Sequence, residues 1–282
     1  MTAFRLHLSN LLVFLVLLGA GTPAAADPRL TFEGSFVQGG LVVARTEPFA
    51  LVEVDGRPTR LSPEGLFLLG FGRDADPTVE ITVTFGDGGV LRRRLDVAER
   101  EFPVQRIEGL PPQQVTPDPK ALERIHAESA LIRTARELDS ARTDFTGGFA
   151  WPVQGTITGV FGSQRILDGE PRAPHSGVDI AAPPGTPVAA AADGVVSLIH
   201  EDMFYTGKTV LLDHGHGLAS IYVHLSEIEV VEGQRVEQGT AIGKVGATGR
   251  ATGPHLHWGV SLNQTRLDPE LLVGPMPKTS AQ

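Results

Sequence analysis

The chain has 282 residues, enough for one large or two modest domains, and its content of 41% apolar and 20% charged residues is that of a globular protein. Its formal net charge is −9 and Arg92-Arg93-Arg94 is its only local basic run, which argues against a nucleic-acid partner. It contains no cysteine, so a thiol nucleophile is excluded, and any bound metal must be held by His, Asp or Glu.

The first 26 residues predict an export signal. Arg5 provides the positive start, residues 11–18 form a short apolar run, and Ala24-Ala25-Ala26 offers a cleavage site. The alternative is a membrane anchor, which the shortness of the apolar run disfavours. We therefore expect cleavage after Ala26 and a mature chain that is periplasmic or secreted and has no membrane span.

Residues 29–102 predict a small antiparallel β-sandwich. Short apolar runs at 41–43, 49–54 and 79–85 alternate with glycine-containing turns. The segment contains no histidine and its acidic residues are scattered at turns, so it indicates no chemistry. We interpret it as a spacer or docking module.

Residues 103–147 predict a linker with one helix. Pro111-Pro112 keeps the first part extended. Asp118 can cap a helix that has Pro119 in its first position and runs to about Arg142. The helix carries a partial apolar stripe, formed by Leu122, Ile125, Ile132 and Ala135. We expect this helix to pack on a neighbouring domain.

Residues 148–275 predict a second β-rich domain, because short strands alternate with Gly and Pro turns. Seven of the nine histidines of the chain lie between positions 175 and 257. Histidine is not a common strand residue, so this concentration indicates a functional site.

Two histidines, His255 and His257, are two residues apart in a predicted strand and therefore share one face. They can serve one ion, or provide one ligand and one acid-base group. His175 and Asp179 can supply two further ligands, since a glycine between them lets the backbone bend. A catalytic zinc site needs about three such ligands and an open position.

The protease signature H-E-x-x-H is absent, because Phe204 occupies the fifth position of the run that begins with His200-Glu201. No glutamate is placed to act as a general base. A histidine can fill that role, and His224 and His255 are the candidates.

A competing H-x-H pair, His214 and His216, lies in a predicted hairpin turn. We expect His214 to lie in the layer of residues around the metal ligands or in the wall of the substrate site. His216 is expected at the surface, and His200 and Asp202 are expected in a loop.

The ordered motifs resemble the M23 family of zinc metallopeptidases, the lysostaphin-like enzymes that contain a LytM-type domain. The family hallmark is H-x-x-x-D followed about eighty residues later by H-x-H, matched here by His175 to Asp179 and His255 to His257. Flanking segments also match, among them Trp151-Pro152, Tyr222-Val223-His224-Leu225 and residues 248–257. The resemblance covers about residues 150–270.

The resemblance implies a mainly β protein with a C-terminal LytM-type peptidase domain. It implies that His175, Asp179 and His257 bind Zn²⁺ and that His224 and His255 flank the metal-bound water. One of these two takes the water proton, and the other stabilises the oxyanion or protonates the leaving amine. The implied function is that of an exported zinc endopeptidase that hydrolyses peptide cross-links of peptidoglycan.

Two departures and two alternatives remain open. The segment 162–174, with Arg165, is longer than in compact members, and we expect a loop over the cleft. It lacks the tyrosine that assists the oxyanion in some relatives, and neither Tyr205 nor Tyr222 can be assigned that role.

One alternative is a catalytically inactive LytM-type domain that binds and activates another wall hydrolase. Another is a sugar- or peptide-binding module with a vestigial metal. Residues 29–102 are expected to mediate targeting or to bind a wall-associated protein.

Overall fold

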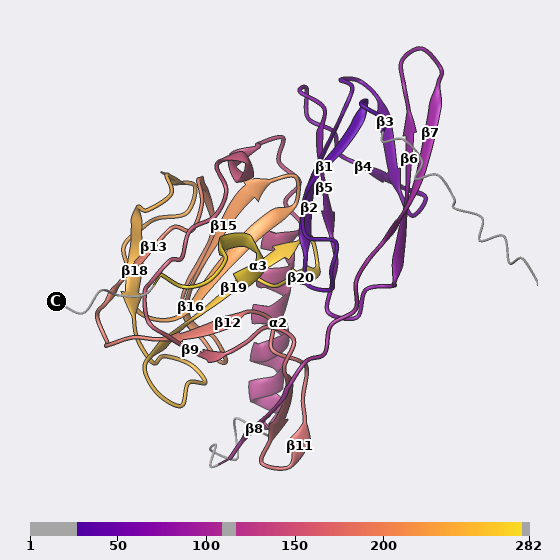
Figure 1. Ribbon diagram of the computed structural model, residues 1–282. Helices are drawn as coiled ribbons and strands as arrows, with labels where there is room; N and C mark the ends of the chain where they lie inside the picture. Colours follow the sequence, from indigo (N-terminus) through magenta and orange to yellow (C-terminus); the bar gives the residue numbers. More distant parts are fainter. Residues whose placement is uncertain (1–26, 109–116, 278–282) are drawn as a thin grey trace, which may run out of the picture.

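The computed structural model describes residues 27–108 and 117–277, so the predicted signal at 1–26 and the Pro111-Pro112 segment lie outside the described residues. The described chain is mostly β, as predicted, with a smaller N-terminal and a larger C-terminal β body (Figure 1). None of the helices in the described ranges is both long and apolar enough to cross a membrane.

The N-terminal body is a sandwich of two antiparallel sheets, which agrees with the predicted architecture. The sheets have the strand orders β1-β2-β5 and β4-β3-β6-β7. Along β6 the alternate side chains of Val79, Ile81 and Val83 are buried, and they pack with Phe67 in a shared core. The strand bounds are β1 Leu30–Gly34, β2 Leu41–Thr46, β3 Leu51–Val54, β4 Arg57–Thr59, β5 Leu66–Gly70, β6 Thr78–Thr84 and β7 Val90–Asp96.

The C-terminal body is a strongly curved ten-stranded sheet. Its main path has the order β17-β14-β15-β16-β19-β12-β9, while β13 and β18 pair with each other, β18 also pairs with β16, and β20 pairs with β19. A large core that includes Tyr222 and Trp258 fills it. The strand bounds are β9 Thr156–Gly159, β12 Val178–Ala181, β13 Pro187–Ala189, β14 Gly194–Met203, β15 Gly207–Gly215, β16 Leu218–Ile228, β17 Arg235–Val236, β18 Ala241–Val245, β19 His255–Leu262 and β20 Thr265–Leu267; the short helix α3 spans Glu270–Val273.

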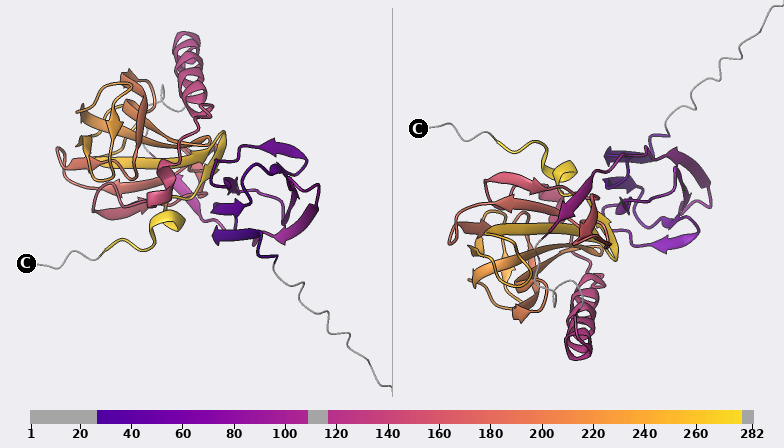
Figure 2. Two further views of the ribbon diagram at one scale, coloured as in Figure 1. Left: turned by 90° about the horizontal axis from the view of Figure 1, so that it is seen from above. Right: turned by 90° about the horizontal axis from the view of Figure 1, so that it is seen from below.

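The sandwich packs against one end of the larger body, as both views in Figure 2 show. Leu41 and Leu68 of the sandwich belong to the same apolar cluster as Leu267 of β20. Arg100 forms an ion pair with the buried Asp268 at 2.8 Å, and the Asp268 amide donates to the Gly39 carbonyl. Apolar packing and a partly buried ion pair therefore hold the two bodies together.

The helix α2, Pro119–Arg136, begins as predicted. The Asp118 side chain accepts a hydrogen bond from the Ala121 amide, and Pro119 occupies the first turn. The helix packs against β14 and β15 and ends six residues earlier than predicted. The carboxylate of Glu128, which is buried, accepts from the Phe204 amide at 2.7 Å and so ties the helix to the turn after β14. A short 3-10 helix, η1 at Asp144–Gly147, follows.

A small separate sheet joins the predicted linker to the predicted 162–174 loop. The loop forms a hairpin of β10, Gln164–Leu167, and β11, Glu170–Pro171, and β8, Val104–Ile107, pairs in parallel with β10. The linker therefore begins as a strand that packs on the larger body. The domain division 29–102, 103–147 and 148–275 stays a prediction.

Candidate functional site

Two adjacent strands and one loop bring the predicted ligands together. Asp179 of β12 lies directly opposite His257 of β19 in the antiparallel register, so their side chains are cross-strand neighbours. His175 enters from the loop before β12, where its backbone amide donates to Ser163 and its carbonyl accepts from Gly162. The predicted neighbourhood of His175, Asp179 and His257 is therefore present in the structure.

The three donor atoms form a compact triangle. His175 Nε2 lies 2.9 Å from Asp179 Oδ1 and 2.9 Å from His257 Nδ1, and the last two atoms are 2.7 Å apart. Such separations place all three within reach of one ion with bonds of about 2.0–2.2 Å. Among the described residues these three form the group able to hold a metal, and two imidazoles with one carboxylate suit a divalent transition ion.

An outer hydrogen bond orients His175, one of the two candidate imidazole ligands. His175 Nδ1 donates to the Val160 carbonyl at 3.1 Å, which leaves Nε2 as the unprotonated nitrogen facing the cluster. His257 instead presents Nδ1 to the cluster. Burial lowers the pKa of His257 to about 4, although the Asp179 carboxylate opposes that shift, so the ring is in the neutral form that binds metals.

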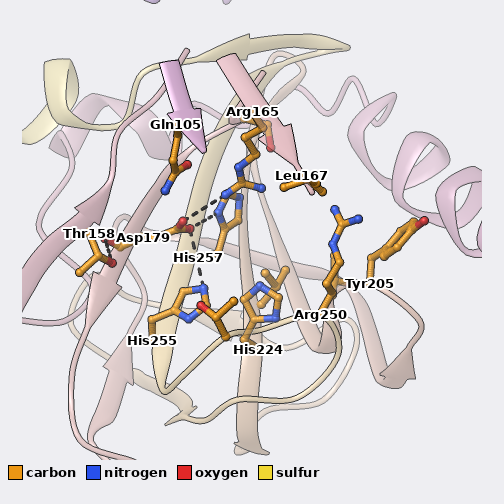
Figure 3. A pocket seen from close by; sticks show the side chains of 14 residues that line it. Gln105, Thr158, Arg165, Leu167, Asp179, Tyr205, His224, Arg250, His255 and His257 are labelled. Atoms are coloured by element: carbon orange, nitrogen blue, oxygen red, sulfur yellow. Dashed lines mark hydrogen bonds and ion pairs between the residues drawn. The ribbon is translucent and has the colours of Figure 1, made fainter. Parts of the chain in front are cut away.

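The carboxylate of Asp179 is held from two sides. Burial by itself would raise its pKa, but the close contacts with the His175 and His257 rings outweigh that effect and hold the pKa well below its usual range. Its other oxygen, Oδ2, forms an ion pair with Arg165 of the hairpin at 3.1 Å. The carboxylate is therefore charged and fixed, and Figure 3 shows it joined to Arg165, His257 and His255.

His224 and His255 form a second layer beside the triangle, with ring centroids 4.7 Å apart. His224 Nδ1 donates to the Thr248 carbonyl and His255 Nδ1 to the Gly253 carbonyl, each at 2.8 Å. The Nε2 atom of each ring is thereby left to exchange a proton, and that of His255 lies 3.9 Å from Asp179 Oδ1. Burial, together with the neighbouring His255 and His257, lowers the pKa of His224 to about 3.

A backbone bend positions His224. Its φ of +64° is a left-handed conformation that is unusual for a side-chain-bearing residue in a strand. The bend falls where β16 changes partners, because Val223 pairs with β19 and Leu225 pairs with β18. The His224 amide consequently leaves the ladder and donates to the Thr206 carbonyl at 2.9 Å. The local strain turns this side chain toward the pocket.

A pocket surrounds the second layer and the triangle. Its walls include the four site residues Asp179, His224, His255 and His257, and other described lining residues are Gln105, Arg165, Leu167, Tyr205 and Arg250. The hairpin therefore lines the cleft, as the loop prediction required. Sequence reasoning missed Gln105 and Arg250. Gln105 reaches the pocket only through the pairing of β8 with β10, and Arg250 carries no motif signal.

The predictions for the competing H-x-H pair were wrong. His216 is buried, at 6% exposure, because its ring packs on Phe145 and its amide donates to the Ser140 carbonyl. His214 is fully buried and bonds to the Asp193 carbonyl at 2.6 Å and to the Ser220 hydroxyl at 2.8 Å. It belongs to the core and is absent from the pocket wall.

Four other side chains can also be placed. The Tyr222 hydroxyl is buried and contacts Ser220 and the Ala191 amide, whereas Tyr205 lines the pocket. His200 and Asp202 lie at the end of β14 instead of in a loop. Tyr205 is therefore the tyrosine available to a substrate.

Comparisons with known proteins agree with this geometry. Residues 173–269 match peptidase family M23. The chain is 43% identical over 104 residues to the DD-carboxypeptidase/endopeptidase Mpg of Neisseria meningitidis, covering 37% of this chain and 24% of Mpg. It is 49% identical over 86 residues to the peptidoglycan DD-endopeptidase ShyA of Vibrio cholerae, covering 30% of this chain and 20% of ShyA. The chain thus matches less than a quarter of the length of these relatives.

One solved structure covers nearly the whole molecule. It is the crystal structure of a Pseudomonas aeruginosa protein assigned to peptidase M23, with a TM-score of 0.63 and 34% identity. The match covers 84% of this chain and 95% of that one, so it includes both β bodies as well as the site. The architecture, the cluster and the sequence agreement lead to one conclusion: this chain belongs to peptidase family M23.

Proposed function

We propose that this protein is an exported zinc endopeptidase that hydrolyses peptide cross-links in peptidoglycan. The observation that carries the proposal is the triangle of His175 Nε2, Asp179 Oδ1 and His257 Nδ1 beside two further imidazoles in one pocket. The names of Mpg and ShyA, which describe peptidase activities of this kind, support the choice of substrate.

The donor set fits Zn²⁺, for which three protein ligands and an open position make a catalytic site. When bound, zinc would polarise the scissile carbonyl and acidify a water molecule. The protein's own part is to keep the ligands deprotonated and rigid. The Arg165 ion pair fixes Asp179, and the Val160 carbonyl fixes the tautomer of His175.

The proposed acid-base groups are His224 and His255. Because each Nδ1–H is already donated to a backbone carbonyl, each Nε2 can accept a proton or, once protonated, donate one. One ring removes the proton of the attacking water. The other donates to the developing oxyanion or to the leaving amine.

The test is digestion of purified peptidoglycan, with mass spectrometry of the released peptides. We expect cleavage that a chelator abolishes and that zinc restores. His255→Ala should lower the rate by about 10²- to 10⁴-fold, the usual contribution of a positioned acid-base group, while zinc binding persists. A protein that binds zinc and peptidoglycan but releases no peptide would instead support the activator or binding-module alternatives.

The proposal includes export and a partner for the sandwich. Export predicts a mature N-terminus at Asp27, which intact-mass measurement of the periplasmic or secreted protein would detect.

For a wall-associated partner, the sandwich offers exposed apolar side chains: Phe49 is 88% and Leu51 72% exposed. Phe49→Asn suits the left-handed φ of +65° at this position, and unchanged localisation of this variant would contradict that partner.

A further inference from the structure

A second cavity lies where the sandwich meets the larger body (Figure 1). Its volume is about 650 Å³, which is within the range of small-molecule sites. Strand β4 of the sandwich lines one side, and the turns that follow β15 and β19 line the other with His216 and Asn263. The cavity shares no lining residue with the metal-site pocket. We call it the interbody cavity.

His216 brings two unpaired polar atoms to the wall of this cavity. The residue is only 6% exposed, and neither of its ring nitrogens has a hydrogen-bond partner among the described residues. Burying a polar group without a partner costs folding free energy. A ligand in the interbody cavity that bonds to the imidazole would remove this cost.

The position of His216 is fixed by the fold. Its backbone adopts a left-handed φ of +53° in the turn between β15 and β16, and its amide donates to the Ser140 carbonyl at 2.9 Å. Its ring meets that of Phe145 edge to face, with the centroids 5.4 Å apart. The imidazole is therefore held at the cavity wall by contacts that leave both nitrogens unpaired.

The state of this imidazole favours a ligand with hydroxyl groups. Burial lowers the pKa of His216, and the nearby charge of Arg60 lowers it further, so the ring is neutral. A neutral imidazole has one N–H donor and one acceptor nitrogen. A hydroxyl group both donates and accepts, and can therefore bond to either nitrogen. An anion could bond only to the N–H.

The rest of the wall fits an uncharged ligand. Among the described lining residues the charged side chains are two arginines and three aspartates, so neither sign dominates. Arg60 and Asp139 form an ion pair across the boundary at 2.6 Å, and both side chains are partly exposed, which places them on the solvent side of the cavity. Pro58 and Leu262 add apolar surface. Sugars combine hydroxyl groups with apolar C–H faces, and so match both kinds of wall.

We propose that the interbody cavity binds an uncharged saccharide, with His216 and the Arg60–Asp139 pair as its polar contacts. This site is separate from the metal ligands and from the two acid-base histidines. The inference goes beyond the proposed function and does not depend on it. In a peptidoglycan hydrolase the site would hold the glycan strand to which the peptides are attached.

The test is calorimetric titration of the purified protein with diacetylchitobiose, the disaccharide of N-acetylglucosamine. His216→Gly removes both ring nitrogens, and glycine adopts the φ of this position freely. We expect this variant to bind about 3- to 30-fold more weakly, as the loss of one or two neutral hydrogen bonds provides. His200→Gly removes a histidine of β14 that does not line the cavity, and should leave the affinity unchanged. Equal affinities of the wild type and His216→Gly would overturn the inference, as would no binding up to about 10 mM.

A measurement on the wild type alone protects the test against a variant that fails to fold. In NMR spectra of the histidine ring nitrogens, the disaccharide should shift the resonances of His216 and leave those of His224 and His255 in place. Shifts confined to His224 and His255 would put the sugar in the metal-site pocket and contradict the inference. Neither measurement involves catalysis, so a negative result leaves the proposed peptidase function intact. A protein that binds the sugar but cleaves no peptidoglycan would instead reject that function and keep this site.

Discussion

The buried histidines of the site make the metal-free protein sensitive to acid. Histidine in an unfolded chain titrates near 6.5, whereas the pKa of His224 is lowered to about 3 in the folded protein. At a pH between these two values, His224 is protonated in the unfolded state but stays neutral in the folded state. The stability from keeping His224 neutral is therefore fully present above about pH 6.5 and is lost as the pH falls toward 3.

The magnitude follows from the two pKa values. At about pH 5, RT ln[(1 + 10^(6.5−5))/(1 + 10^(3−5))] gives a loss of about 2 kcal/mol for His224. His257, with a pKa of about 4, should add a similar loss. Asp179 loses stability in the same direction, as the pH falls, but because its folded pKa is lowered from 3.8, its contribution is lost only below that pH. At about pH 5 the histidine effect is therefore separate from acid titration of this carboxylate.

The assay is urea unfolding of the chelator-treated protein at about pH 8 and pH 5, compared with His224→Asn. Asparagine tolerates the left-handed backbone at this position, and it does not titrate. Between the two pH values the wild type should lose about 2 kcal/mol more than the variant. His200→Asn makes the same replacement outside the pocket and serves as the control. An equal loss in the wild type and in His224→Asn would refute the reasoning.

Two further substitutions test the packing around the site and between the two bodies. A Cβ at Gly159 would overlap the Asp179 carboxylate, so Gly159→Ala should weaken zinc binding about 10- to 100-fold by titration calorimetry, whereas Gly86→Ala, with nothing within 4 Å, should not. Unchanged zinc affinity in Gly159→Ala would show that the ligands can move freely. Arg100→Ala should lower the free energy of unfolding by about 1–3 kcal/mol in urea, because it leaves the buried Asp268 unpaired. A change below about 0.5 kcal/mol would mean that the ion pair does not couple the two bodies.

Local patterns in the sequence were enough to predict the shared face of His255 and His257 and the helix start. Period-two spacing put His255 and His257 on one face, and the structure places both beside Asp179. Asp118 followed by Pro119 predicted the start of α2, and that cap is present. In these cases the interacting groups are close in sequence or lie at one strand period.

Long-range packing accounts for what the sequence did not reveal. Gln105 lines the pocket because β8 pairs with β10, some sixty residues later, and no local pattern specifies that pairing. His216 was expected at the surface because it lies in a hairpin turn. It is buried because the chain after α2 folds back over that turn through Phe145 and Ser140.

The most direct test of the central claim is the position of bound zinc, located by anomalous diffraction at the zinc edge from crystals of the loaded protein. The account predicts a peak at about 2.0–2.2 Å from His175 Nε2, Asp179 Oδ1 and His257 Nδ1, with His224 and His255 outside bonding distance. A zinc ion bonded to His224 or His255, or one bound elsewhere while this triangle stays empty, would contradict it.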